Sequence, residues 1–217
     1  MRGAIAFLTT VAVLLGLGAA ADAAVTRRAE QQVSEQVSAE IGAPATVDLQ
    51  GWPVSLRLLT GVVPRVDLVA ADVPLEDTDA ELSELRATLT DVRLRLADLS
   101  SAGVPIEAGP TSFEADLDAG DVERLLGPVA AIGEIELLDG LARLTVAGFP
   151  IEGTVGVEGG AIVVRPTAPI LNLGEVTVPL PALPGGVSVQ QAVVRPGVLR
   201  LSGATPTFHL DPADPTG

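Results

Sequence analysis

Residues 46–72, TVDLQGWPVSLRLLTGVVPRVDLVAAD, contain the pattern around which the rest of the chain is arranged. A strand over residues 46–50 meets a Gly-Trp-Pro corner, which leads through a short apolar turn over residues 54–59 into a second strand. Pro53 fixes its own φ and restricts Trp52 towards extended geometry, so the corner is stiff. Trp52 is the only tryptophan, and aliphatic residues follow it closely. This much apolar surface must either be covered by protein or cover something else.

The composition excludes several classes of protein. The 217 residues are enough for one domain or two, and a chain of this length buries a sizeable core without staples. There is no cysteine, which excludes disulfides and thiolate chemistry. Every one of the 13 basic residues is arginine, and the formal charge of −15 argues against nucleic acid as a partner. Hydrophobic content is 47% with only 2% aromatics, so the core is predicted to be aliphatic.

Residues 1–24 read as a targeting segment. Arg2 is followed by an apolar run over residues 4–21 and by Ala-Asp-Ala, which offers small residues for a signal peptidase. The alternative is an uncleaved membrane anchor, because the run approaches the length that crosses a bilayer. The Ala-rich end favours cleavage. Both interpretations place the remainder outside the cytoplasm, in the periplasm or on the outer face of the cytoplasmic membrane.

The next segments predict an α+β fold that is mostly antiparallel β. Residues 26–41 form a helix with Thr26 as N-cap, and its narrow apolar stripe is expected to pack against a sheet. Its members recur every four residues: Val25, Ala29, Val33, Val37 and Ile41. Alternation of apolar and polar residues from position 46 onward predicts strands, with a change of phase near Thr90 and Asp91. Such a change turns every later side chain over unless a bulge absorbs it, and bulges bend strands, so we expect a long curved sheet that partly wraps the helix.

The second half repeats these themes. A strand-like stretch has Phe113, Ala115 and Leu117 on one face, and residues 118–126 read as a second short helix with Asp118 or Asp121 as its cap. Asp139-Gly140 and Gly159-Gly160 are hairpin turns. The Gly-aromatic-Pro-aliphatic sequence at Trp52 recurs at Phe149, which is ordinary turn chemistry or the trace of two related halves, about 25–102 and 103–208. We therefore predict one domain over residues 25–208, with residues 209–217 as a flexible tail.

No group of residues predicts catalysis. His209 is the only histidine, and it lies near the proline-rich C-terminal segment. The chain has no G-x-S-x-G sequence, no H-E-x-x-H, no EF-hand loop and no phosphate-binding glycine loop. We predict a protein that is not an enzyme, with no metal site and no cofactor. The remaining feature is aliphatic surface, which two short helices cover incompletely.

The order of these motifs resembles that of a known family. A helix after an export signal, then the Gly-Trp-Pro-aliphatic corner with its Leu-Leu-Thr-Gly turn, then R-V-x-L-x-A-x-D-V, is similar to the actinobacterial LmeA-like phospholipid-binding proteins. Residues 113–117 leading into 121–126 also resemble that family. The resemblance implies phospholipid as ligand, a role in envelope lipid or lipoglycan biogenesis, and a fold akin to tubular lipid-binding domains. It supplies no catalytic residues.

We therefore expect an apolar groove for acyl chains. Its candidate residues, each of which is equally compatible with plain core, are Trp52, Val54, Leu56, Leu59, Phe113, Leu125, Phe149 and Ile151. Arg57 and Arg65 are candidates for the lipid headgroup, with ion pairs to acids such as Asp67 as the alternative. A membrane surface is a further candidate partner. The rival hypothesis is a non-catalytic envelope scaffold or adaptor that binds a protein partner.

Overall fold

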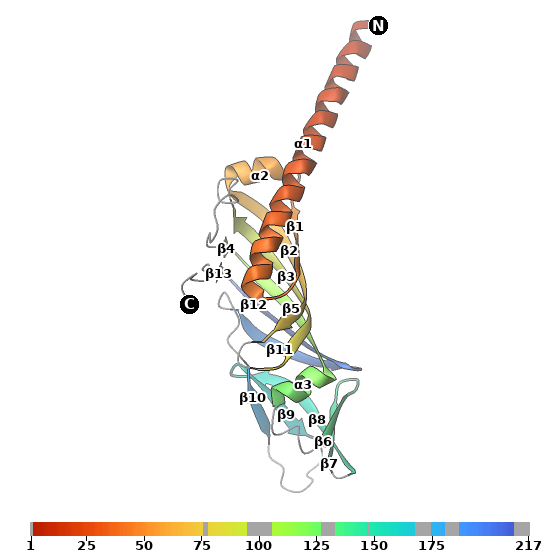
Figure 1. Cartoon of the computed structure of the whole chain (residues 1–217), viewed down its shortest axis with the longest axis vertical. Coiled ribbons are helices and arrows are strands. Elements are labelled where there is room, and N and C mark those ends of the chain that lie inside the picture. Colours follow the sequence, from red (N-terminus) through yellow and green to blue (C-terminus); the bar gives the residue numbers. More distant parts are fainter. Residues whose placement is uncertain are drawn as a thin grey trace.

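The computed structural model describes residues 2–75, 78–94, 106–126, 133–146, 148–167, 175–180 and 187–210, with side chains from residue 22 to residue 209. Within these ranges the chain is elongated, and its first helix projects from one end (Figure 1). The helices are α1 (Arg2–Ile41), α2 (Val54–Thr60) and α3 (Ala119–Leu126). The strands are β1 (Ala45–Gln50), β2 (Val62–Pro74), β3 (Glu81–Arg93), β4 (Ile106–Ala108), β5 (Thr111–Asp118), β6 (Gly133–Leu137), β7 (Ala142–Val146), β8 (Phe149–Glu158), β9 (Ala161–Pro166), β10 (Val176–Pro179), β11 (Ser188–Arg195), β12 (Val198–Thr205) and β13 (Phe208–Leu210).

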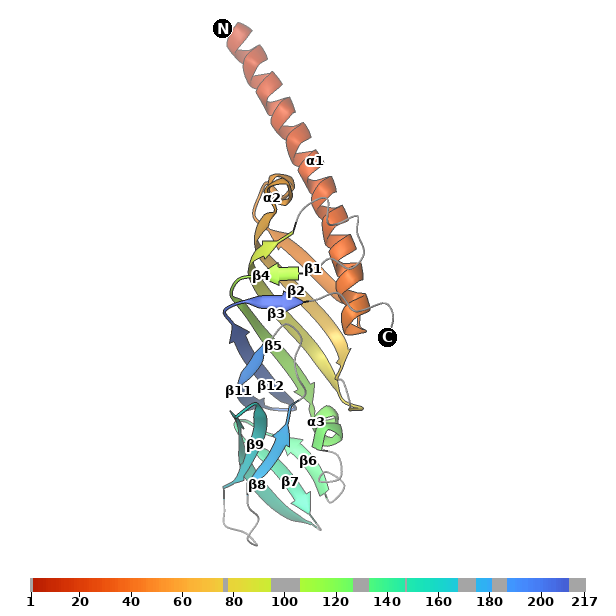
Figure 2. The same ribbon diagram turned by 90° about the vertical axis from the view of Figure 1, so that its left-hand side faces the viewer.

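Two antiparallel sheets follow one another along the long axis (Figure 2). Sheet A has the order β1-β2-β3-β5-β12-β11, with β4 and β13 attached beside β3. Sheet B has the order β10-β9-β8-β7-β6. Sheet A is curled, and α1 packs on it at the β1 side. The predicted α+β, mostly antiparallel fold with a long curved sheet and an N-terminal helix is confirmed.

Helix α1 protects the outer edge of sheet A. The backbone N–H groups of Ala45, Val47 and Leu49 point away from β2 and have no strand partner. Ser38 Oγ, Ser34 Oγ and Glu30 Oε1 accept hydrogen bonds from them at 2.8, 3.0 and 3.1 Å, respectively. Four helical residues advance about 6.0 Å and two strand residues about 6.7 Å, so the two spacings nearly match over this length. The helix thus occupies an edge that another strand would otherwise pair with.

The apolar stripe predicted for this helix is confirmed, but its predicted start is wrong. Ala29 and Val37 are buried, while Val25, Val33 and Ile41 pack against the same core. The helix ends at Ile41, before Gly42 with φ 68°. It begins at Arg2, because Thr26 is an interior residue whose Oγ1 donates to Asp22 O at 2.8 Å. Threonine bonds back along a helix in this way as readily as it caps one.

The predicted change of phase at Asp91 is present, and both strands share it. Asp91 has φ 50°, and buried residues shift there from Leu89 to Val92. The register with β2 is the same on both sides, since Val66 pairs with Leu89 and Val63 pairs with Val92. The two strands therefore turn together, so no one-residue bulge in β3 is needed to absorb the change.

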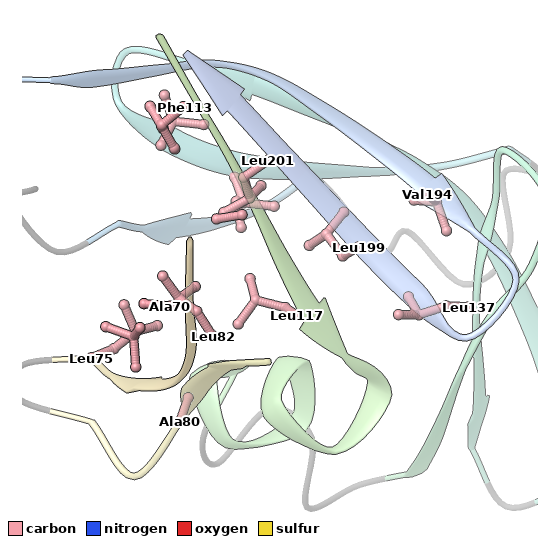
Figure 3. Close-up of a cluster of buried hydrophobic side chains, with 14 of the residues drawn as sticks. Ala70, Leu75, Ala80, Leu82, Phe113, Leu117, Leu137, Val194, Leu199 and Leu201 are labelled. Carbon is pink, nitrogen blue, oxygen red and sulfur yellow. The ribbon is translucent and has the colours of Figure 1, made fainter. Parts of the chain in front are cut away.

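The buried aliphatic residues form two clusters. The upper core lies where α1, α2 and the first strands meet; its buried members are Ala29, Val37, Val47, Leu49, Val54, Leu58, Val63, Val66, Leu89, Val92 and Ala108. The lower core joins sheet A to sheet B and includes Ala70, Leu82, Ala115, Leu117, Ile135, Leu137, Ile162, Val194, Leu199 and Leu201. Figure 3 shows Leu117 of β5 between Ala70 and Leu82 on one side and Leu199 on the other.

Other local predictions are confirmed. Phe113, Ala115 and Leu117 share the buried face of β5, and Asp118 Oδ1 accepts the N–H of Asp121 at the start of α3. The hairpin turns fall at Gly140 and at Gly159-Gly160, where φ is positive. Residues 211–217, which hold most of the predicted tail, lie outside the described residues.

Two further observations bear on the organisation of the chain. Sheet A combines strands from both of the proposed halves, and the division into halves stays a prediction. Among the described residues, no helix is long and apolar enough to cross a membrane.

Candidate functional site

The inner face of sheet A carries two adjacent rows of side chains in the middle of the sheet. Strand register places Ala45, Ala70, Leu85, Ala115, Leu201 and Ala192 in one row. The neighbouring row is Val47, Leu68, Ala87, Phe113, Gly203 and Val189. Small side chains dominate the first row and recur in the second. The side chains therefore project only a short distance from the backbone here, because alanine and glycine are small.

Part of this surface stays incompletely buried. Ile41, Ala45, Leu68 and Ala87 contact both the upper and the lower core yet are only partly buried, and Leu85 beside them is also partly buried. We call these five residues the inner strip. A partly exposed aliphatic strip at the centre of a sheet differs from ordinary core, in which central residues are fully enclosed. The strip runs from the end of α1 across β1, β2 and β3.

Close packing beside the strip is set by a glycine. Gly203 pairs with Phe113 across β5 and β12, and a Cβ on Gly203 would collide with the Phe113 ring and with Ser188 O. The Phe113 side chain is 7% exposed and fills the space that this glycine leaves. Phe113 therefore forms a wall at the side of the inner strip next to Ala87.

The eight predicted groove residues do not come together in one place. Val54 and Phe113 are buried, and Leu125 and Ile151 are partly buried. Trp52, Leu56 and Leu59 are exposed at the α2 end, whereas the exposed Phe149 lies in sheet B at the opposite end (Figure 1). The structure thus separates them into core residues, an exposed group around α2 and a distant pair on β8.

The two predicted headgroup residues have different surroundings. The Arg65 guanidinium pairs with Asp67 at 2.9 Å, and this pairing lowers the pKa of the Asp67 carboxyl. Asp67 also accepts a hydrogen bond from Thr88 Oγ1 at 2.8 Å. Arg65 therefore forms the ion pair with Asp67 that the sequence analysis gave as the alternative to headgroup binding. Arg57 is exposed on α2, and the described part of the chain gives it no ion pair.

A polar hollow of about 420 Å³ lies against β3, β5, β11 and β12. Most of its lining side chains belong to the outer face of sheet A; the lining residues are Arg86, Thr88, Ser112, Phe113, Glu114, Gln190, Gln191, Ser202, Gly203 and Ala204. Arg86 is held by Glu84 at 2.6 Å. Sequence reasoning missed this hollow because its lining comes from four strands whose register is not visible in the sequence.

Two of the less exposed charged groups in the described part of the chain form structural pairs. Arg200 Nε and Nη2 donate to the two carboxylate oxygens of Asp116 at 2.7 and 2.6 Å, which lowers the pKa of Asp116. Asp121 is buried, and its Oδ1 accepts from Glu81 N at 2.9 Å and from Arg124. Burial raises the pKa of Asp121. No group of potential metal ligands occurs among the described residues.

Comparison with known proteins identifies the family of this chain. The family model for LmeA-like phospholipid-binding proteins matches residues 19–204. The chain belongs to the LmeA-like phospholipid-binding family. No curated protein and no solved structure gives a significant match. The match spans both sheets and the end of α1, so the inner strip lies wholly within the LmeA-like region.

Proposed function

We propose that this LmeA-like protein binds phospholipid by laying acyl chains along the inner strip of sheet A. The observation that carries the proposal is the incomplete burial of Leu68, Leu85 and Ala87 between two aliphatic cores. Covering them with an acyl chain would remove apolar surface from water on both sides, and each methylene that is buried contributes about 0.8 kcal/mol. Several methylenes therefore give useful affinity without a charged contact.

The small alanine and glycine residues in the two rows of the inner face support this placement of the acyl chains. An acyl chain is narrow, and it lies closest to a sheet where side chains are small. Ala45 and Ala87, which are partly buried, provide such a surface beside the end of α1, and the larger Phe113 and Leu201 lie at its far side. The arrangement predicts binding by shape and apolar contact, with no group in the strip that selects a headgroup.

We also propose that the protein binds phospholipid in the cell envelope. Arg2, the apolar run over residues 4–21 and the small residues that follow it support export to the cell envelope, either the periplasm or the outer face of the cytoplasmic membrane. There, the protein would support envelope lipid or lipoglycan biogenesis by holding phospholipid, and no reaction is assigned to it.

Native mass spectrometry of protein purified from its own host tests the proposal. The spectrum should show a population heavier than the polypeptide by the mass of one or more phospholipids. Ala87→Phe places a ring between Leu68 and Phe113 and should remove most of that population. The matched control is Val69→Phe, on the outer face at a site already 43% exposed, which should leave it intact.

Both variants are first compared with the wild type by thermal unfolding, so that loss of lipid is separated from loss of fold. Wild-type protein that carries no lipid would refute the proposal. If that protein instead carries a stoichiometric polypeptide, the scaffold or adaptor function is favoured.

A further inference from the structure

Helix α2 is apolar on the side that faces away from the protein. Val54 and Leu58 point into the upper core with 5% and 0% exposure, as their spacing of four residues requires. Leu56 and Leu59 lie on the opposite side of the helix and are 54% and 69% exposed. A helix that only covered a core would carry polar residues at these positions.

The exposed leucines belong to a larger group at the same end of the molecule. Trp52 in the corner before α2 is 72% exposed, and Val62 directly after the helix is 42% exposed. We call Trp52, Leu56, Leu59 and Val62 the apolar tip. Figures 1 and 2 both place α2 beside α1 at the end of sheet A, on the side towards the N-terminus of α1.

A buried carboxylate fixes the tip to α1. Asp22 Oδ1 accepts a hydrogen bond from Ser55 N at 2.7 Å, and Asp22 Oδ2 accepts one from Val54 N at 3.3 Å. These are N–H groups of the first turn of α2, which have no partner within the helix. Asp22 is 6% exposed, and the hydrogen bonds from Ser55 lower its pKa. The tip is therefore held at the level of residue 22 in α1.

Residue 22 is also where the apolar N-terminal run stops. The sequence of residues 4–21 contains no charged residue, and Asp22 is the first charge after it. The structure thus sets an exposed group of Trp, Leu and Val next to the end of the chain's longest apolar helical segment. Tryptophan is enriched at the boundary between hydrocarbon and headgroups, because its ring is apolar and its N–H is polar.

The local charge agrees with a lipid surface. The chain as a whole has a formal charge of −15, yet residues 49–66 contain no acidic residue and two arginines, of which Arg65 pairs with Asp67. Arg57 projects from α2 between the two exposed leucines in sequence and has no ion pair among the described residues. An arginine at the margin of an apolar patch can meet a lipid phosphate while the leucines enter the headgroup region.

We propose that the apolar tip docks on a lipid bilayer, with Trp52, Leu56 and Leu59 inserted at the interface and sheet B directed away from it. This surface is separate from the inner strip, and its partner is the bilayer itself. It would place the protein upright on the membrane from which it takes phospholipid or to which it delivers phospholipid. The inner strip then lies farther along the long axis than the tip (Figure 2).

Trp52 reports on this docking directly, since it is the only tryptophan. The full chain is mixed with vesicles of phosphatidylcholine, or of phosphatidylcholine brominated near the headgroup end of one acyl chain. Docking predicts a blue shift of the emission maximum with both vesicles and a loss of intensity with the brominated ones. Insertion of the N-terminal run alone brings the chain to the vesicle, but it does not move Trp52 into the bilayer unless the tip docks.

Two variants and one lipid control complete the experiment. Leu56→Ser/Leu59→Ser should abolish the quenching, whereas Phe149→Ser, which removes a 73% exposed aromatic residue from sheet B, should leave it unchanged. Brominated short-chain phosphatidylcholine below its critical micelle concentration should not quench Trp52. Emission that stays unshifted with vesicles, equal quenching in the serine variant, or quenching by monomeric lipid would each overturn the proposal.

Discussion

Ser34 Oγ accepts a hydrogen bond from the backbone N–H of Val47 at 3.0 Å, 13 residues along the chain. The same contact is made four helical residues later by Ser38 with Ala45. A polar stripe on α1, one residue after the apolar stripe, thus takes the place of a neighbouring strand. The helix both covers the upper core and blocks the edge of sheet A, so it is bound to the sheet by two different kinds of contact.

Removing this polar stripe tests its contribution to stability. Ser34→Ala/Ser38→Ala should lower the free energy of unfolding by about 1 kcal/mol in a urea titration, because two lost hydrogen bonds outweigh the helix propensity that alanine gains. The control is Ala39→Ser on the exposed side of the same helix, which reports propensity alone at about 0.5 kcal/mol. A double variant more stable than the wild type would contradict the edge role.

Gly203 should tolerate no side chain. A Cβ there would meet the Phe113 ring and the Ser188 carbonyl, which is backbone and cannot move aside. Gly203→Ala should therefore lower the free energy of unfolding by about 3 kcal/mol. Gly156→Ala in β8 is the matched change, since nothing lies within 4 Å of its added Cβ, and it should be neutral or slightly stabilising. Equal unfolding midpoints for the two variants would show that Gly203 is not constrained.

The Asp116–Arg200 pair should stabilise the sheet more than the surface pairs do. Its side chains are only 14% and 22% exposed, and the two hydrogen bonds join β5 to β12. Asp116→Asn should cost about 1.5–3 kcal/mol, as hydrogen bonds to charged groups do. Glu107→Gln, which breaks the exposed pair with Arg93, should cost less than about 1 kcal/mol.

The effect of Asp116→Asn should also depend on pH. The hydrogen bonds from Arg200 hold the pKa of Asp116 below its usual range, so the unfolded carboxylate is protonated first as pH falls. The stability that this lowered pKa provides is therefore complete above pH about 4 and is lost as pH falls through the folded pKa. The difference between wild type and variant should shrink in acid. A difference that is constant down to pH about 2 would contradict the ionic nature of the pair.

We propose that residues 1–24 remain on the protein as the uncleaved alternative, although the Ala-rich end favours cleavage. Cleavage at the Ala-Asp-Ala sequence would remove Asp22, which is buried and accepts the N–H groups of Val54 and Ser55. The family match also begins at residue 19, before that sequence. Intact mass measurement of protein from its own host should show the N-terminal residues. A mass that lacks them would mean that α2 is held without this carboxylate.

Much of the fold could be predicted from local patterns. Alternation identified β2, β3 and β5, glycine pairs identified two hairpins, and a periodic stripe identified the sheet-facing side of α1. The start of α1 could not be predicted, because no breaker separates residue 22 from Thr26 and a targeting segment is commonly removed. Strand β12 was also missed, since neighbouring prolines concealed a strand that lies between β5 and β11.

The site was less predictable than the fold. Residues of the inner strip come from positions as distant as Ile41 and Ala87, and only the strand register brings them together. The exposure of individual residues could not be predicted either. Trp52 and Val54 are both apolar and lie two residues apart, but they are 72% and 5% exposed. Their exposure differs because their side chains point in different directions, and these directions depend on how α2 packs on the sheet.

Photo-crosslinking with a phospholipid that carries a diazirine in its acyl chain tests the central claim most directly. The chain has no lysine, so trypsin cuts only at arginine, and residues 66–86 and 87–93 carry residues of the inner strip without those of the tip. The account predicts crosslinks in residues 66–86 and 87–93, which carry Leu68, Leu85 and Ala87. Residues 29–57 carry both Ala45 of the strip and Trp52 of the tip, so they do not discriminate. Crosslinks that are absent from residues 66–86 and 87–93 but present in residues 58–65 or in sheet B would contradict acyl-chain binding along the inner strip.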